Sequence, residues 1–128
     1  MIYLDTSVAL AHLLSEDRQP PDTLWAQSLV ASRLLEYELW TRLNARGLSA
    51  SHGEAARRLV ERLALVELLP NVLARALEPF PSSVRTLDAL HLASITFLRQ
   101  RDPRIELASY DERLVASART LGIPIASL

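Results

Sequence analysis

The sequence predicts a single α/β domain over residues 1–128, a three-layer, doubly wound fold with a central, mostly parallel sheet. Short apolar segments alternate with helical segments of about ten to fifteen residues, as in sheets whose strands are connected by helices. The chain is 49% hydrophobic and 23% charged, which is typical of a globular domain. A chain of 128 residues buries roughly two-thirds of its unfolded surface, so its core requires neither disulfides nor structural zinc.

The first strand is expected at residues 1–4, an apolar and β-branched run that ends at Asp5-Thr6-Ser7. All three of these residue types cap helices, so a helix is expected to follow over residues 7–15. Two prolines and four charged residues in the segment 16–22 indicate a loop or a helix start. Residues 27–31 are the second candidate strand.

Ser32 is expected to cap the next helix, which ends at Gly47. Its apolar residues recur every four positions, at Leu35, Leu39 and Leu43. Another helix is expected from Ser51 to about Leu65.

The segment 65–69 is apolar and β-prone, and Pro70 interrupts it. We expect a third strand there, followed by a short helix that starts at Asn71 and ends before Pro79. The helix expected next, over residues 86–101, is the longest of the C-terminal part.

The C-terminal part is expected to add two strands and one helix. Residues 105–109 alternate in polarity as a strand does. Asp111 opens the following helix, and Gly122 ends it. Residues 123–126 are expected to form a last short strand.

The composition excludes several kinds of chemistry. All 14 basic residues are arginine, so Schiff-base chemistry, Walker-A phosphate binding and phospho-receiver chemistry lack their lysine. The chain has no cysteine and no GxSxG or HExxH motif, and its three glycines, Gly47, Gly53 and Gly122, are spaced too far apart for a GxGxxG motif. The formal net charge of −1 gives no overall attraction to nucleic acid, so nucleic-acid binding requires local basic patches.

We expect a cytoplasmic protein without a membrane segment. A signal peptide has a basic region before an apolar run, and the N-terminus MIYLD has no such region. No uninterrupted apolar stretch reaches the roughly 18 residues of a membrane span.

Four acidic residues are expected at or near the carboxyl ends of the strands, where parallel sheets bind ligands. Asp5 ends the first strand, Asp111 follows the strand at 105–109, and Asp88 lies in the first turn of a helix. Glu38 lies beside the buried row of its helix. Each has a simpler interpretation, because the aspartates suit helix caps or first turns and Glu38 could pair with Arg42. Together they concentrate negative charge that favours a hard cation such as Mg²⁺ or Mn²⁺.

Other polar residues give weaker signals. Glu36 lies two positions from Glu38, roughly 200° around the helix, and should point elsewhere. His91 is interpreted first as a packing residue, with support of the acids as the alternative. Arginines near the helix starts suit either a solvated face or phosphate binding. These are Arg33, Arg42, Arg46 and Arg113.

Four segments resemble the acidic motifs of the PIN-domain nucleases, and most closely those of the VapC-type toxins of toxin–antitoxin pairs. The segments are IYLDTSVAL, SRLLEYELWTRL, VRTLDALHLASI and ASYDERLVASARTLGIPI. They occur in the expected order and span nearly the whole chain. The resemblance implies that Asp5, Glu38, Asp88 and Asp111 are the catalytic, metal-binding acids, with Thr6 or Ser7 as a polar neighbour. Whether Glu36 contributes stays open.

The resemblance implies an endoribonuclease that uses Mg²⁺ or Mn²⁺ to activate a water molecule against an RNA phosphodiester. It also implies a homodimer that a cognate antitoxin protein holds inactive. Two alternatives stay open from the sequence. One is a PIN-fold nuclease that acts on DNA or in RNA processing, and the other is a catalytically silent PIN-like binding module.

Overall fold

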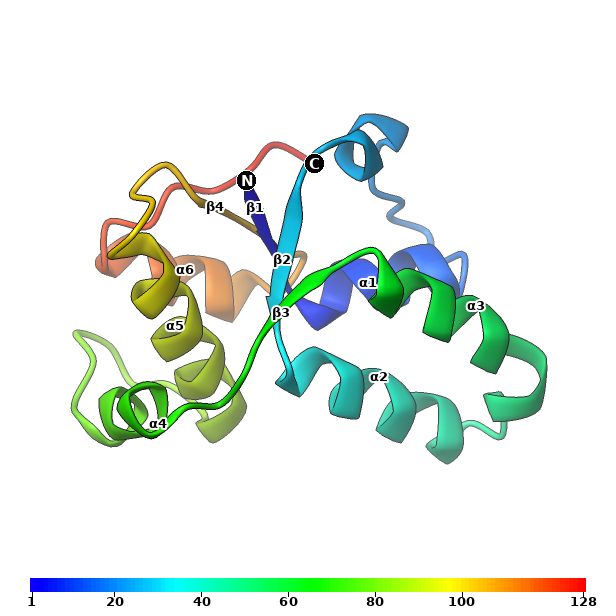
Figure 1. The fold of residues 1–128 in the computed structure, drawn as a ribbon, viewed down its shortest axis with the longest axis horizontal. Coiled ribbons are helices and arrows are strands. Elements are labelled where there is room, and N and C mark those ends of the chain that lie inside the picture. Colours follow the sequence, from blue (N-terminus) through cyan, green and yellow to red (C-terminus); the bar gives the residue numbers. More distant parts are fainter.

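The computed structural model describes residues 1–128 and contains a four-stranded sheet in the order β3-β2-β1-β4 (Figure 1). All three strand pairs are parallel, which confirms the predicted sheet type. The strands are β1 (Ile2–Leu4), β2 (Leu29–Ser32), β3 (Ala64–Val66) and β4 (Glu106–Ala108).

Helices cover both faces of the sheet, so the predicted three-layer arrangement is also present. The helices are α1 (Thr6–Leu13), α2 (Leu34–Ala45), α3 (Ser49–Glu61), α4 (Pro70–Leu77), α5 (Thr86–Arg99) and α6 (Glu112–Thr120), with a short 3₁₀ helix η1 (Asp22–Ala26). In Figure 1, α1, α2 and α3 lie on one side of the sheet, and α4, α5 and α6 lie on the other. None of the helices combines the length and the hydropathy required to cross a membrane.

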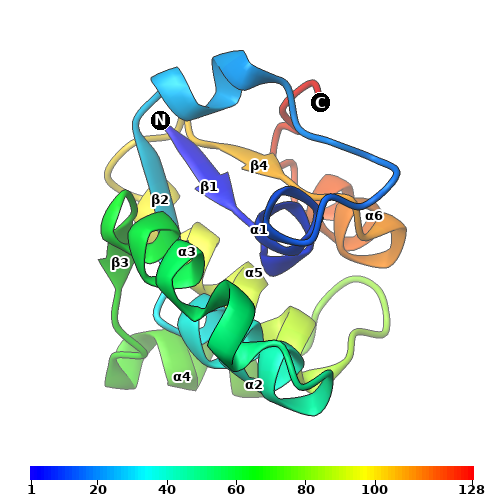
Figure 2. The same ribbon diagram turned by 90° about the vertical axis from the view of Figure 1, so that its right-hand side faces the viewer.

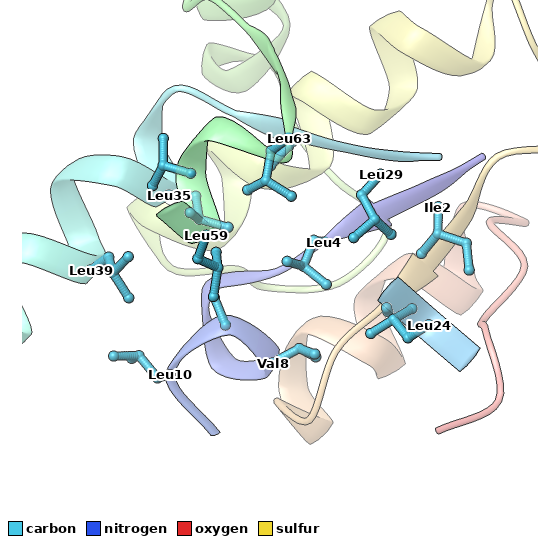
Figure 3. Packing of buried hydrophobic residues seen from close by; sticks show 14 of the residues in the cluster. Ile2, Leu4, Val8, Leu10, Leu24, Leu29, Leu35, Leu39, Leu59 and Leu63 are labelled. Atoms are coloured by element: carbon cyan, nitrogen blue, oxygen red, sulfur yellow. The ribbon is translucent and has the colours of Figure 1, made fainter. Parts of the chain in front are cut away.

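The side chains of β1 alternate between two hydrophobic clusters. Ile2 and Leu4 belong to the larger cluster, on the side of α1, α2 and α3 (Figure 3). Tyr3 points to the opposite face and packs in the cluster that includes residues of α5 and α6. This alternation is the two-residue period of a strand, here with both faces buried. The central strand therefore fixes the positions of both helical layers.

Helix α2 packs through the predicted row, because Leu35, Leu39 and Leu43 are fully buried. Gly47 ends the helical segment with a φ of +68°, a conformation that favours glycine. The predicted cap is shifted by one residue. The Ser32 hydroxyl accepts a hydrogen bond from the amide of Leu34 at 3.0 Å, but Arg33 occupies the N-cap position.

Two elements in the middle of the chain differ from the prediction. Helix α3 begins two residues earlier than the predicted helix at 51–65 and ends at Glu61. The third strand lies at Ala64–Val66 rather than at 65–69, because Ala64 pairs with Val30 of β2. Residues 64–65, which the prediction placed at the end of the helix, therefore belong to the strand that pairs with β2.

The predicted strand at 123–126 is wrong as a continuous strand. Only an isolated bridge joins Leu107 to Ile125. The chain there accepts a hydrogen bond at the carbonyl of Pro124 and donates one from Ala126. Pro124 has no amide hydrogen, which limits the length of any ladder at this position.

The strand order places a topological switch point between β1 and β4. The chain adds β2 and β3 on one side of β1 and then places β4 on the other side. The amide of Asp5 extends this pairing, because it donates to the carbonyl of Ala108 at 3.0 Å. The N- and C-termini lie at the other edge of the molecule, away from the carboxyl ends of the strands (Figure 2). Crevices at such switch points are the usual ligand sites of open parallel sheets.

The buried row of α2 predicts a clear difference between neighbouring positions. Leu39→Ala should lower the free energy of unfolding by about 2–5 kcal/mol, because it leaves a cavity in the larger cluster. Tyr37→Ala, at a side chain that is 65% exposed, should change it by less than about 0.5 kcal/mol. Urea unfolding followed by circular dichroism measures both values. Similar losses in the two variants would contradict the assigned packing of α2.

Candidate active site

An acidic cleft of about 690 Å³ opens at the carboxyl edge of the sheet. Its lining includes all four acids that the sequence analysis selects: Asp5, Glu38, Asp88 and Asp111. They come from four separate elements and meet where the helices α1, α2, α5 and α6 begin (Figure 1). In the following, "acidic cleft" denotes this cavity and these four residues.

Asp5 caps helix α1 and also faces the cleft. Its Oδ2 accepts hydrogen bonds from the hydroxyls of Ser7 and Ser109, at 2.6 and 2.8 Å, and from the Ser7 amide at 3.4 Å. Its Oδ1 lies 3.8 Å from Nε2 of His91 and accepts no hydrogen bond from the protein. Asp5 therefore caps the helix through Oδ2 and keeps Oδ1 for the cleft, so one carboxylate can serve both roles.

A chain of polar side chains holds Glu38 in place. Its Oε1 accepts a hydrogen bond from the Thr6 hydroxyl at 2.9 Å and lies 2.6 Å from Nε2 of His91. On the other side of the imidazole, Nδ1 is 2.8 Å from the hydroxyl of Tyr3. In the neutral ring, a proton on Nε2 satisfies both contacts, because Nδ1 then accepts from the tyrosine.

His91 is buried, as its packing interpretation requires, but it also contacts the acids directly. Burial lowers the pKa of His91, yet the hydrogen bond to Glu38 and the charges of Asp5, Glu38 and Asp88 raise it, with a net increase above the usual value. Burial chiefly raises the pKa of Tyr3, and the neighbouring charge of Asp5 adds to this effect. This shift widens the pH range in which the imidazole carries positive charge on the buried side of the cleft.

Arg85 connects the other two acids. Its Nε lies 3.1 Å from Oδ2 of Asp88, and its Nη2 lies 3.1 Å from Oδ2 of Asp111. Asp111 caps α6 through Oδ1, which accepts hydrogen bonds from the amides of Arg113 and Leu114. Burial raises the pKa of Asp88, although Arg85 opposes this shift.

The donor set of the cleft fits a hard divalent cation. No group of three or more acidic or histidine side chains is already arranged around a single point. However, three carboxylates each keep one oxygen that accepts no hydrogen bond from the protein: Oδ1 of Asp5, Oε2 of Glu38 and Oδ1 of Asp88. Carboxylate oxygens without thiolates or further histidines suit Mg²⁺ and Mn²⁺.

The structure distinguishes Glu38 from Glu36. Glu36 accepts a hydrogen bond from Arg33 at 3.2 Å and does not line the cleft. Arg33 also pairs with Glu67 at 2.7 Å, which keeps its guanidinium on an exposed surface. Glu36 therefore lies outside the group of acids that the fold brings together.

Of the two interpretations of the four arginines, the solvated face fits most of them better than phosphate binding in the cleft. Only Arg42 lines the cleft, whereas Arg33, Arg46 and Arg113 do not. The sequence analysis missed Arg18, which lines the cleft and lies over the ring of Tyr110, 4.4 Å from its centroid. No local pattern marks Arg18, because the loop that carries it meets Tyr110 only in the folded chain.

Arg85 was missed for a different reason. It stands three residues before Asp88, a spacing at which side chains of a helix start can pair. That signal is present in the sequence, but it gives no indication of the second partner, Asp111.

The two uses of Asp5 predict opposite effects for two substitutions. In EDTA, Asp5→Asn should be as stable as the parent or more so, because the amide keeps an acceptor for Ser7 and Ser109 and removes a repelling charge. Asp5→Ala removes the acceptor and should lose about 1–2 kcal/mol. Urea unfolding in EDTA measures both. An equal loss in the two variants would show that the fold requires the charge itself.

Comparison with known proteins gives consistent results for family and fold. The model of the PIN domain family matches residues 2–119. The relatives include ribonuclease VapC47 of Mycobacterium tuberculosis, which is 33% identical over 99% of this chain and 96% of its own length. Ribonuclease VapC46 of the same species is 32% identical over 97% and 95%, respectively.

Solved structures share the fold at lower sequence identity. A chain of a toxin–antitoxin complex from Klebsiella pneumoniae superimposes with a TM-score of 0.70 at 15% identity, over 99% of this chain and 97% of that one. VapC20 of M. tuberculosis, described as a sarcin–ricin loop cleaving toxin, gives 0.68 at 22% identity, over 91% and 95%.

Proposed function

The chain belongs to the PIN domain family, and from this membership and its acidic cleft we propose that it is a metal-dependent endoribonuclease, the toxin of a type II toxin–antitoxin pair. The observation that carries the proposal is the meeting of four acids from four elements at the switch point of the sheet. The names of the relatives, both ribonucleases, support RNA over DNA as the substrate.

In this proposal Asp5, Glu38, Asp88 and Asp111 hold Mg²⁺ or Mn²⁺ and are the catalytic residues. Bound there, the cation would polarise the phosphodiester and lower the pKa of a water molecule that attacks the phosphorus. No protein nucleophile is required, in keeping with the absence of cysteine and of a serine elbow.

The surrounding residues of the chain position the acids. Ser7 and Ser109 orient Asp5 through its Oδ2 and leave Oδ1 directed to the cleft. Thr6 and His91 bind one oxygen of Glu38 and leave the other available. Such support restricts the rotation of carboxylates, so less conformational freedom is lost when a cation binds.

RNA binding requires local positive charge, because the chain as a whole is slightly acidic. Arg18 and Arg42 line the cleft and can bind phosphate groups of the RNA. The Arg18 guanidinium lies over the ring of Tyr110, and its outer face offers a plane on which an unpaired base can stack. We therefore assign single-stranded or looped RNA as the substrate class.

The first test of this function is cleavage of unstructured and structured RNAs by the purified protein. RNA should be cut with Mn²⁺ or Mg²⁺ and left intact in EDTA. Asp5→Asn and Asp111→Asn should reduce the rate by orders of magnitude, because each removes a carboxylate ligand. Glu36→Gln is the matched control, since Glu36 lies outside the cleft, and it should cut as the parent does.

Thermal melting gives an independent measurement in the same experiment. Mn²⁺ should raise the melting temperature of the parent more than that of Asp5→Asn, because a ligand that binds only the folded state stabilises it. Equal cleavage in EDTA, or full activity of Asp5→Asn, would refute the metal mechanism.

We further propose a homodimer and a cognate antitoxin as protein partners. Leu69, directly before α4, and two leucines of α4 are exposed at every fourth position, and α5 and α2 add one exposed apolar side chain each. The exposed residues are Leu69, Leu73, Leu77, Leu87 and Tyr37. Apolar surface of this kind marks protein interaction sites. The toxin–antitoxin complex from K. pneumoniae has the same fold, which supports an antitoxin partner.

The proposed dimer surface can be tested by light scattering. The parent should be dimeric and should gain mass with the product of an adjacent small gene. Leu77→Asp should weaken dimerisation without loss of fold, because this side chain is 90% exposed. Leu128→Asp makes the same change at an exposed leucine away from α4 and should stay dimeric. A monomeric parent that does not bind that product would contradict both partners.

A further inference from the structure

Arg85 occupies a position among the acids that a bound cation would also use. We propose that Arg85 is an internal counter-ion of Asp88 and Asp111, and that a divalent metal ion displaces it on binding. This inference rests on the metal site proposed above. According to this inference, Arg85 competes with the metal ion for the two carboxylates and does not help to bind it.

The contacts of Arg85 are those of a bridging cation. Two nitrogens of one guanidinium reach carboxylates on two elements, Asp88 in α5 and Asp111 at the start of α6, both at 3.1 Å. The other oxygen of Asp111 is already bound by two backbone amides of α6. The oxygen that Arg85 binds is therefore the one through which Asp111 would contact a metal ion most readily.

Burial shows which partner can move. The side chain of Asp88 is 12% exposed and that of Asp111 is 31% exposed, whereas that of Arg85 is 57% exposed. The long arginine side chain can rotate into water without opening the core, and exposed ion pairs contribute little to stability. Asp88 and Asp111 are fixed in place by α5 and α6, so Arg85 is the group that must move when a metal ion binds.

The other basic side chain that contacts the acids, His91, cannot be exchanged in this way. His91 is 3% exposed and is held between Tyr3 and Glu38. Its removal from the acids would require an opening of the core. Of the two basic side chains that contact the acids, Arg85 is thus the one that can leave when a metal ion arrives, while His91 remains.

If a metal ion displaces Arg85, then Arg85→Ala should strengthen metal binding and lower the stability of the metal-free protein. Arg85→Ala should bind Mn²⁺ roughly five- to tenfold more tightly than the parent, because the metal no longer competes with the two ion pairs of Arg85. In EDTA the same variant should melt at a lower temperature, since the carboxylates lose their compensating charge.

The matched control is Arg113→Ala. It removes the same charge from the same region, but Arg113 contacts Asp111 only through its backbone amide and makes no ion pair with the acids, whereas Arg85 makes two. Isothermal titration calorimetry with MnCl₂ and melting in EDTA, on the full chain at fixed pH and ionic strength, give both readouts without RNA. Arg113→Ala should match the parent in both.

The outcomes separate the two proposals. Unchanged or weaker Mn²⁺ binding by Arg85→Ala would overturn the counter-ion role, even if the variant melts early, since a merely structural residue gives that result. Tighter binding by Arg113→Ala to the same degree would also overturn it, because the effect would then be one of net charge. A lack of Mn²⁺ binding by the parent and all variants would refute the metal site itself, and this inference with it.

Discussion

Carboxylates that are brought together away from bulk water repel one another unless positive charge lies between them, and the arrangement of the acidic cleft follows from this constraint. Asp5 and Asp88 are buried, so water screens their charges only weakly. The basic groups that contact the acids are an imidazole with a raised pKa on the buried side and a guanidinium on the exposed side. The imidazole is enclosed by the core, whereas the guanidinium is open to solvent.

The fold determines where this charge collects. The order of the sheet leaves the ends of β1 and β4 side by side, and the amide of Asp5 pairs with Ala108 across them. Strands β1 and β4 lead into helices capped by Asp5 and Asp111, and Thr6, which donates to Glu38, begins α1. Packing of Leu35, Leu39 and Leu43 then holds α2 at the angle that turns Glu38 toward the cleft. Stability and site geometry therefore rest on the same buried contacts.

Much of this could be predicted from local sequence signals. Caps at Asp5 and Asp111 and the four-residue row of α2 are encoded within a few positions, and the structure has them. The contacts of Arg18 and the second partner of Arg85 could not be predicted, because they join segments that are distant in sequence. The C-terminal strand was predicted from its apolar residues, but Pro124 and the available edge of β4 limit it to a bridge.

Tyr3 connects the core to the cleft through a single side chain. Its ring packs in the cluster beside α5 and α6, while its hydroxyl contacts the imidazole that holds Glu38. Mutation at this position is thus subject to two selection pressures at once, one on volume and one on hydrogen bonding. Phenylalanine satisfies the first and histidine or glutamine only the second. Sequence drift at residue 3 should consequently be slower than at core positions of equal burial, such as Leu4.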